Sequence, residues 1–260
     1  MSELDVKQSV QRQFGPVAAH YATSAVHVAG PDLDAMLAAA TTRGDERLLD
    51  AGCGAGHTAL AFAPRVAEVV AVDLTEAMLA QARRLAAERG LTNIVFQRGD
   101  VEQLPFPDGA FDIVTSRYSA HHYPHPEVAL REFARVLRPG GLFLLVDVVS
   151  PGDPAQDTFL NAIELLRDPS HVRDHTSAQW RGMLGAAGFV GDLLRSWDLP
   201  LNFEAWVARM NTPPLAVSQL RALFDGAPGE VRAALGIAGG QDYSFSVPVA
   251  LLRGRLRVTR

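Results

Sequence analysis

The sequence predicts an α/β fold in which helices cover both faces of a doubly wound, mostly parallel sheet. Two observations carry this prediction. Short apolar runs such as 68–73 alternate with longer amphipathic stretches such as 75–89, which is the order expected of β-α units. The apolar run that ends at Asp50 leads into three glycines at alternate positions. Because glycine permits tight turns, residues 48–56 are expected to form the first central strand, a turn and a helix start.

The bulk composition is that of a globular protein. The chain has 260 residues, of which 48% are hydrophobic and 20% charged, and this suits one large α/β domain. The net charge of −5 gives no reason to expect nucleic acid or an anionic membrane as a partner. The one cysteine, Cys53, excludes an intrachain disulfide, so a cytoplasmic location is expected. Neither a signal peptide nor an integral membrane segment is expected, since the most apolar run, 142–149, is too short to span a bilayer.

Residues 1–44 are predicted to form a helical cap ahead of the first strand. Apolar residues recur there at spacings of four, four and three, consistent with one face of a helix. These residues are Val6, Val10, Phe14 and Val17. Gly15-Pro16 is expected to break or bend that helix near its middle.

Residues 45–260 are predicted to form the sheet domain, in which strands and helices alternate after the glycine loop. Thr75 and Gly90 suit the N-cap and the terminator of one amphipathic helix. The other expected elements are a helix at 57–63, strands at 94–101 and 113–116, a helix at 126–137 and a fifth strand at 142–149.

The C-terminal half is predicted to add two insertions and the last strands. Thr176 and Gln179 have the spacing of a capping box and predict a helix that ends before Gly188. The second insertion is expected to form a helical lid with breaks at Pro213 and Gly226. The remaining expected segments are insertions at 150–175 and 202–236, a sixth strand at 190–199 and an antiparallel seventh strand at the sheet edge, within 243–258.

The glycine spacing argues for a cationic ligand in preference to a pyrophosphate. A dinucleotide loop needs Gly-x-Gly-x-x-Gly, whereas the glycines here are at 52, 54 and 56. Asp50 before the loop would repel a pyrophosphate but could bind a cation. The pattern Asp-x-Gly-Cys-Gly-x-Gly resembles motif I of class I S-adenosylmethionine methyltransferases, whose ligand carries an ammonium and a sulfonium.

Two further acids lie at the ends of expected strands. Asp73 comes one β-α-β unit after Asp50, where a carboxylate can accept from both hydroxyls of a ribose in NAD and S-adenosylmethionine enzymes alike. Asp100 begins the string Gly-Asp…Leu-Pro-Phe-Pro-Asp-Gly-Ala-Phe-Asp, which resembles the methyltransferases of ubiquinone and menaquinone biosynthesis. In that family the acid accepts from the adenine amino group, and the next residue, here Val101, offers its backbone amide. The resemblance covers about 45–150 and implies a Rossmann-like, three-layer, seven-stranded fold.

The resemblance also implies a cofactor site around the carboxyl ends of the first strands. Tyr21 stands in a segment that folds over the cofactor in many small-molecule methyltransferases, and simple packing of its helix is the alternative. Met78 would point toward the adenosine or pack in the core. The set expected at the cofactor is Tyr21, Asp50, Gly52, Cys53, Gly54, Gly56, Asp73, Leu74, Met78, Asp100, Val101 and Arg117.

Adjacent histidines after the fourth strand are the candidates for a catalytic base. Methyl transfer is an in-line displacement, in which the protein aligns the reactants and removes a proton from the acceptor. Imidazole titrates near neutral pH, so His122 is the first candidate and His121 the second, with a structural role as the alternative. A metal site is not expected, because His171 and His175 share a face only in a helix and Asp-Pro-Ser before them predicts a loop.

Residues that bind the methyl acceptor are expected in the insertions and beside the histidines. Arg167 and Arg173 could grip an anionic acceptor, or pair with Asp168 and Asp174 at the surface. The helices of 202–236 would form an apolar cap, a dimer face or a satellite core. The set expected at the acceptor is Tyr118, Arg167, His171, Arg173 and Trp206.

These observations predict S-adenosylmethionine-dependent methyl transfer to a small molecule, with S-adenosylhomocysteine as product. The acceptor is expected to be aromatic, lipophilic or anionic, with O-, C- and N-methylation left open, and the enzyme to be a monomer or a homodimer. An NAD-dependent oxidoreductase is one alternative, although Asp50 and the glycine spacing speak against it. A non-catalytic protein that binds S-adenosylmethionine is the other, although the acids at 50, 73 and 100 are all present.

Overall fold

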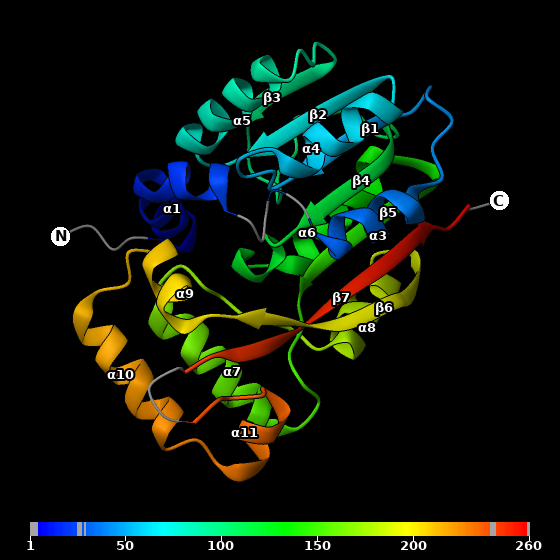
Figure 1. The fold of residues 1–260 in the computed structure, drawn as a ribbon. Coiled ribbons are helices and arrows are strands. Elements are labelled where there is room, and N and C mark those ends of the chain that lie inside the picture. Colours follow the sequence, from blue (N-terminus) through cyan, green and yellow to red (C-terminus); the bar gives the residue numbers. More distant parts are fainter. Residues whose placement is uncertain (1–4, 25–27, 29, 240–242, 259–260) are drawn as a thin grey trace.

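Strand β1 (Arg47–Ala51) lies in the interior of the sheet, paired in parallel with β2 (Glu68–Asp73) and β4 (Phe111–Arg117). The computed structural model describes residues 5–24, 28, 30–239 and 243–258, and within them the strand order is β3-β2-β1-β4-β5-β7-β6 (Figure 1). The remaining strands are β3 (Ile94–Arg98), β5 (Leu137–Val148), β6 (Phe189–Leu201) and β7 (Phe245–Leu256). The chain order reverses between β1 and β4, and sheets of this type bind ligands at that point, beyond the carboxyl ends of the strands.

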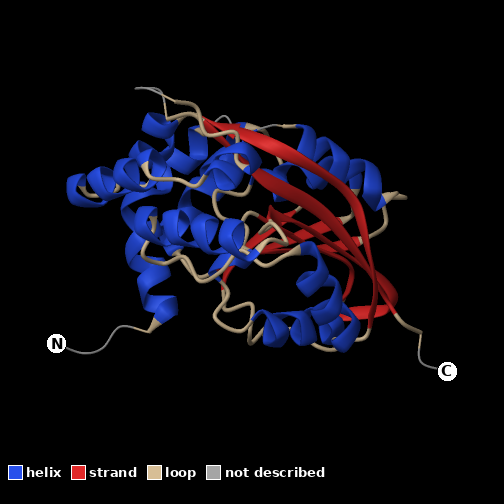
Figure 2. Cartoon of the chain, turned by 90° about the horizontal axis from the view of Figure 1, so that it is seen from below, coloured by secondary structure: helices blue, strands red, loops and turns tan. Residues whose placement is uncertain are grey.

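Helices cover both faces of the sheet, so the predicted three-layer fold is confirmed (Figure 2). Met36 of α3 and Phe62 of α4 pack on one face, whereas Phe133 of α6 and Trp180 of α8 pack on the other. The helices of the described residues include α1 (Val6–Thr23), α3 (Pro31–Ala40), α4 (His57–Phe62), α5 (Glu76–Glu88), α6 (Pro126–Val136), α7 (Pro154–Arg167), α8 (Ser177–Ala186), α9 (Phe203–Arg209), α10 (Pro214–Asp225) and α11 (Gly229–Ala234).

Two local expectations need correction. Helix α1 continues through Gly15 and Pro16 to Thr23, so these residues do not break it. The buried residues after the proline, Val17 among them, pack against the domain and offset the hydrogen bond that proline removes. Strand β5 begins at Leu137 and not at residue 142, because Leu137 already pairs with Phe111 before an irregularity in the register.

Strand β7 is not the edge strand. It lies between β5 and β6 and is antiparallel to both, so β6 forms the edge (Figure 1). The pairing of β7 with β5 covers only Val249–Arg255, whereas its pairing with β6 continues to Phe245. The two strands therefore extend as a two-stranded ribbon past the end of β5. The alternating pattern of β7 predicts a strand but does not reveal which neighbours it pairs with.

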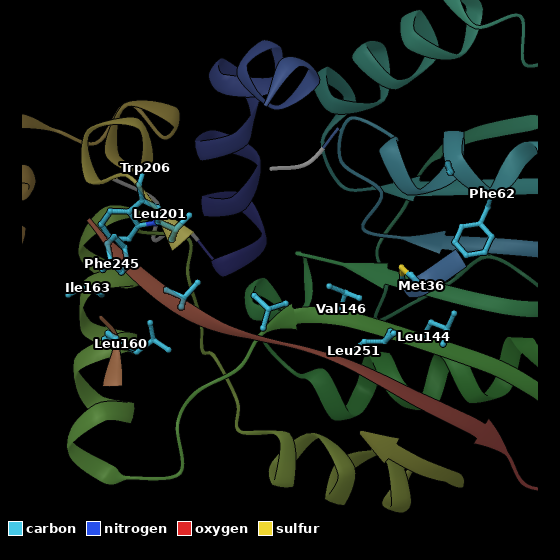
Figure 3. Packing of buried hydrophobic residues seen from close by; sticks show 14 of the residues in the cluster. Met36, Phe62, Leu144, Val146, Leu160, Ile163, Leu201, Trp206, Phe245 and Leu251 are labelled. Atoms are coloured by element: carbon cyan, nitrogen blue, oxygen red, sulfur yellow. The ribbon is translucent and has the colours of Figure 1, made fainter. Parts of the chain in front are cut away.

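The helices predicted as a lid, within 202–236, pack against this ribbon. Helices α9, α10 and α11 follow β6, as the breaks at Pro213 and Gly226 predict, and α7 lies beside them (Figure 1). Trp206 and Phe245 pack edge to face at 5.0 Å, and Figure 3 shows them in the same apolar cluster as Leu144 of β5 and Phe62 of α4. The lid and the sheet thus share one continuous core. None of the described helices is long and apolar enough to cross a membrane.

Candidate active site

A cavity with about 930 Å³ of empty space, its open mouth included, lies beyond the carboxyl ends of β1, β2, β3 and β4. Helix α1 contributes Lys7, Val10, Phe14 and Tyr21 to one wall of this first cavity. Most of the predicted cofactor residues line it: Tyr21, Gly52, Cys53, Gly54, Asp73, Leu74, Met78, Asp100, Val101 and Arg117. Asp50 and Gly56 are absent from the lining.

The glycine loop needs glycine for conformational and steric reasons. Gly52, Gly54 and Gly56 all have positive φ angles, of 69°, 52° and 86°. A Cβ atom at Gly52 would collide with the Ser119 hydroxyl, and a Cβ at Gly56 would lie 2.8 Å from the Cβ of Ala82. Gly52 therefore keeps the cavity floor close to the loop after β4, while Gly56 lets α4 pack on α5.

Asp73 ties the loop to the end of β2. Its Oδ2 accepts from the backbone amide of Gly54 and its Oδ1 from that of Thr75, both at 2.8 Å. Burial raises its pKa, while the two amide hydrogen bonds oppose that rise. Each carboxylate oxygen has two acceptor sites, so the fixed carboxylate at the cavity wall can still accept from a pair of ligand hydroxyls.

Asp50 does not line the cavity and instead supports the loop from within the protein. Its side chain is 1% exposed and accepts from the backbone amide of Ala59 in α4 and from the Thr115 hydroxyl of β4. Burial raises the pKa of Asp50 to about 7. The carboxyl group thus holds the glycine loop between β4 and the first turn of α4, because that turn has free amides that attract an acceptor.

Asp100 is engaged by a lysine that the sequence motifs do not reveal. The Lys7 ammonium of α1 lies 2.6 Å from Asp100 Oδ2 and 2.6 Å from Glu102 Oε2. Asp100 Oδ1 accepts from the Glu102 amide. The ion pair links α1 to the loop after β3, and all three side chains belong to residues that line the first cavity. A lysine nearly one hundred residues before its partners has no signal in a linear motif.

Arg117 at the end of β4 is fixed by a buried ion pair. Its Nε donates to Asp32 Oδ2 of α3 at 2.6 Å, and both side chains are about 5% exposed or less. Its guanidinium carbon lies 5.1 Å from the centre of the Tyr118 ring. Asp32 therefore orients a cation at the cavity wall. The sequence predicts Arg117 there, but not the acid that orients it.

A second cavity, with about 550 Å³ of empty space, adjoins the first. The two share four lining residues, which are Phe14, Tyr21, Tyr118 and His122. The ribbon supplies Leu199, Leu201 and Val247, so its extension past β5 builds one apolar wall. Helices α7 and α9 supply the charged side chains of Glu164, Arg167 and Arg209, together with the Trp206 ring.

The two candidate histidines differ in charge. His121 donates from Nδ1 to Asp147 Oδ1 at 2.7 Å, and Asp147 Oδ2 accepts from the backbone amides of Ala120 and His121. Burial lowers the pKa of His121, but the Asp147 carboxylate outweighs burial and raises that pKa to about 9. His121 is therefore an imidazolium at neutral pH, and so it cannot accept a proton.

His122 is neutral and has one nitrogen free to act as an acceptor. Its Nδ1 donates to the Ser170 carbonyl at 3.0 Å, which places the lone pair on Nε2, and that atom lies 3.8 Å from Asp168 Oδ2. Burial and the positive charge of His121 lower the pKa of His122 to about 4. Phe14 packs edge to face on the ring at 4.9 Å. Between the two histidines, this geometry favours His122 as a proton acceptor.

The predicted acceptor residues divide into two groups. Tyr118, Arg167 and Trp206 line the second cavity, whereas His171 and Arg173 are absent from its lining. Arg173 is bound by Asp157 at 2.7 Å, and the buried His171 lies 3.2 Å from Asn161 Oδ1. The segment 168–176 is a loop, as its Asp-Pro-Ser sequence predicts, and it turns these two side chains toward α7.

Arg167 is paired, whereas two other cavity residues keep unpartnered atoms. The Arg167 guanidinium binds Glu164 at 3.1 Å and donates to the Trp206 carbonyl. Among the described residues, Asp174, 1% exposed, has no hydrogen bond to its Oδ2, and Arg209 has none to its Nε. Neither is predicted at the site from the sequence, because Asp174 enters only as a surface partner in one of two alternatives for the arginines and Arg209 belongs to no motif. Within the described residues, no group of three or more histidine, cysteine and acidic side chains is arranged to hold a metal ion.

Comparisons with known proteins agree with the residue pattern. A family model described as a methyltransferase domain matches residues 49–145. YcgJ of Bacillus subtilis, described as an uncharacterized methyltransferase, is 41% identical over 244 residues, which are 93% of this chain and 96% of that protein. The crystal structure of YcgJ has a TM-score of 0.85 and covers 87% of this chain and 98% of its own.

Two further relatives match smaller parts of the chain. YafE of Escherichia coli is 45% identical over 181 residues, which are 70% of this chain and 87% of YafE. The ubiquinone/menaquinone biosynthesis C-methyltransferase UbiE of Ectopseudomonas mendocina is 39% identical over 116 residues, which are 43% of this chain and 45% of UbiE. The resemblance predicted from the sequence motifs is confirmed.

Proposed function

Since the chain belongs to the methyltransferase family that includes YcgJ, we propose that it transfers a methyl group from S-adenosylmethionine to a small-molecule acceptor. S-adenosylhomocysteine would be the second product. One observation carries the proposal: the first cavity meets a second one at Phe14, Tyr21, Tyr118 and His122. Donor and acceptor can therefore lie side by side, as an in-line displacement requires.

The residues of the first cavity fit the proposed cofactor. Asp73 would accept from the ribose hydroxyls, because its carboxylate is fixed by two amides and lines the wall. Asp100 and Val101 would meet the adenine, and Arg117, held by Asp32, would bind the carboxylate of the methionine part. When bound, S-adenosylmethionine supplies a methyl group already activated by its positive sulfur.

We assign the role of general base to His122. The Ser170 carbonyl fixes the tautomer with the lone pair on Nε2, so that nitrogen can take a proton from the acceptor. Asp168, 3.8 Å from Nε2, would stabilise the imidazolium that then forms. The low pKa of His122 favours an acceptor whose own proton is acidic, because proton transfer to a weak base is efficient only from an acid of similar strength.

The acceptor side supports a small molecule. The second cavity is lined by charged and apolar side chains together, as sites for small organic molecules are, and the net charge of −5 argues against nucleic acid as the acceptor. The single cysteine supports a cytoplasmic location.

Calorimetric titration with S-adenosylmethionine, S-adenosylhomocysteine and NAD tests the cofactor assignment. We expect the first two to bind and NAD not to bind. Asp73→Asn should weaken S-adenosylhomocysteine binding by about ten-fold or more, because one charged acceptor is lost. Asp192→Asn, which makes the same charge change at an exposed ion pair with Arg253, is the matched control and should bind as the wild type does. Binding of NAD alone would overturn the proposal.

A further inference from the structure

We propose that the methyl acceptor is an organic acid, whose anionic group is bound by Arg209 while its apolar part packs against the β6–β7 ribbon. This inference rests on the proposed function, since it names the class of molecule that occupies the second cavity. Three observations support it: the balance of charge in the cavity, the unpartnered atoms of two polar side chains, and the apolar side chains that line the same cavity.

The charges that line the second cavity do not cancel within the cavity. Arg167 is matched by Glu164 at 3.1 Å, and His121 by Asp147 at 2.7 Å. Arg209 has no ion pair within the part of the chain that the structure describes, and Glu164, which acts on it through space, is already bound to Arg167. One positive charge is therefore left without a counterion of its own, beside a second guanidinium.

Arg209 is placed to receive an anion. Its Nε is buried and makes no hydrogen bond to any described residue, although a guanidinium offers five donors and such groups are normally satisfied when buried. Burial and the nearby Arg167 lower the pKa of Arg209, and Tyr21 and Glu164 oppose this decrease only in part. An anionic ligand group would supply both the missing acceptor and the missing charge.

Asp174 is compatible with an anionic ligand in spite of being an acid. Its residue is 1% exposed, and burial raises the pKa of its carboxyl group well above the usual range. A raised pKa favours the neutral form of the carboxyl group, which does not repel an anion as a carboxylate does. Among the described residues its Oδ2 has no hydrogen-bond partner, and in the neutral form Asp174, which lines the cavity, could be a second donor to the ligand.

The remaining lining predicts the rest of the molecule. Leu199, Leu201 and Val247 of the ribbon form an apolar wall, joined by Val148 at the end of β5. A ligand with a charged group at one end and an apolar body at the other satisfies both walls. A neutral, wholly apolar acceptor would leave the buried Nε of Arg209 without an acceptor, which costs binding energy.

Fluorine NMR on the full chain saturated with S-adenosylhomocysteine tests this inference. The probes are para-fluorohydrocinnamate, its uncharged amide, and para-fluorobenzyl phosphate, and line broadening gives their dissociation constants. We expect the carboxylate to bind at least about ten-fold more tightly than the amide. The phosphate probe distinguishes a carboxylate site from a general anion site. Equal binding of carboxylate and amide, or no binding of either acid, would overturn the inference.

Variants of Arg209 locate the charge. Arg209→Gln should reduce carboxylate binding to the level of the amide, whereas Arg209→Lys should keep part of the preference. Arg221→Gln is the matched control. It removes the same charge from an exposed ion pair between Arg221 of α10 and Glu204 of α9, and it should leave the preference for the carboxylate intact. A preference that survives in Arg209→Gln would contradict the assignment to this residue.

Calorimetry with S-adenosylhomocysteine on the same samples separates this inference from the proposed function. Binding in Arg209→Gln equal to that of the wild type would show that the variant is folded and that its first cavity is intact. If the wild type fails to bind S-adenosylhomocysteine but still prefers the carboxylate, the proposed function fails and the anion site stands. If it binds S-adenosylhomocysteine and shows no preference, only the acid acceptor is wrong.

Discussion

The two adjoining cavities are built in different ways. The lining of the first comes from the segment 52–124 and from α1, and contacts between neighbouring β-α units, such as that of Gly54 with Asp73, hold it in place. The second collects side chains from α1, β5, α7, the loop after it, the ribbon and α9. A nucleotide-like cofactor can therefore be recognised by local strand-turn-helix units, whereas recognition of the acceptor depends on how distant elements pack.

The two cavities also differ in the groups that hold their charged side chains. In the first, the acid at Asp73 is held by backbone amides and the acid at Asp100 by Lys7. In the second, Arg167 is paired with Glu164 and His121 with Asp147, whereas Arg209 has no ion pair among the described residues. A neutral His122 lies where both cavities meet. If this division is correct, substitutions on each side should affect different measurements.

The largest expected loss of turnover is that of His122→Asn, because His122 lines both cavities. In His122→Asn the amide can still donate to the Ser170 carbonyl, but no group replaces the free Nε2. Turnover with an accepted substrate, followed by release of S-adenosylhomocysteine, should fall by roughly 10²–10⁴-fold, with cofactor affinity unchanged. His125→Asn, at an exposed histidine of the same segment, should behave as the wild type. Unchanged turnover in His122→Asn would remove His122 as the base.

A glycine substitution should damage the first cavity alone. Gly52→Ala places a methyl group against Ser119 at a positive φ, so unfolding by urea should show a loss of about 3–4 kcal/mol, and S-adenosylhomocysteine binding should be lost. Gly182→Ala in α8 meets no atom within 4 Å and should stabilise the protein by about 0.5–1 kcal/mol. Similar losses in both variants would show that the loop is not special.

The pH dependence of stability should report on the second cavity. The pKa of His121 is raised to about 9 in the folded protein, so its contribution is present below about pH 6.5 and is lost as the pH rises toward 9. The free energy of unfolding should fall by up to about 3 kcal/mol over this range, and this loss should be absent in His121→Asn. Subtracting the two pH profiles removes the groups that both proteins share. An identical decline in both would contradict the ion pair with Asp147.

The sequence motifs predict the first cavity well because their signals are local. Glycine spacing and acids at strand ends depend on turns and β-α units of a few residues, and ten of the twelve expected cofactor residues line the cavity. The two exceptions are instructive, since Asp50 and Gly56 serve the loop indirectly. Asp50 holds the first turn of α4, and Gly56 allows α4 to approach Ala82. A motif identifies which residues matter but does not separate contact with a ligand from support of the loop.

The acceptor side could be predicted only in part. Arg167 and Trp206 line the second cavity as expected, but Arg173 is neutralised by Asp157, and Arg209 and Asp174 were not expected there. An arginine in a sequence has the same charge whether it binds a ligand or a neighbouring acid. Its partner is set by packing between elements that lie far apart in the chain.

The β-α order, the glycine turn and the cofactor-type acids can be predicted from the sequence alone, because each depends on local periodicity or on backbone angles. Long-range packing is what places β7 inside the sheet, extends the ribbon past β5, and leaves Arg209 without an ion pair among the described residues. These depend on strand partners and on the pairing of buried charges, and both are set by contacts between residues many positions apart.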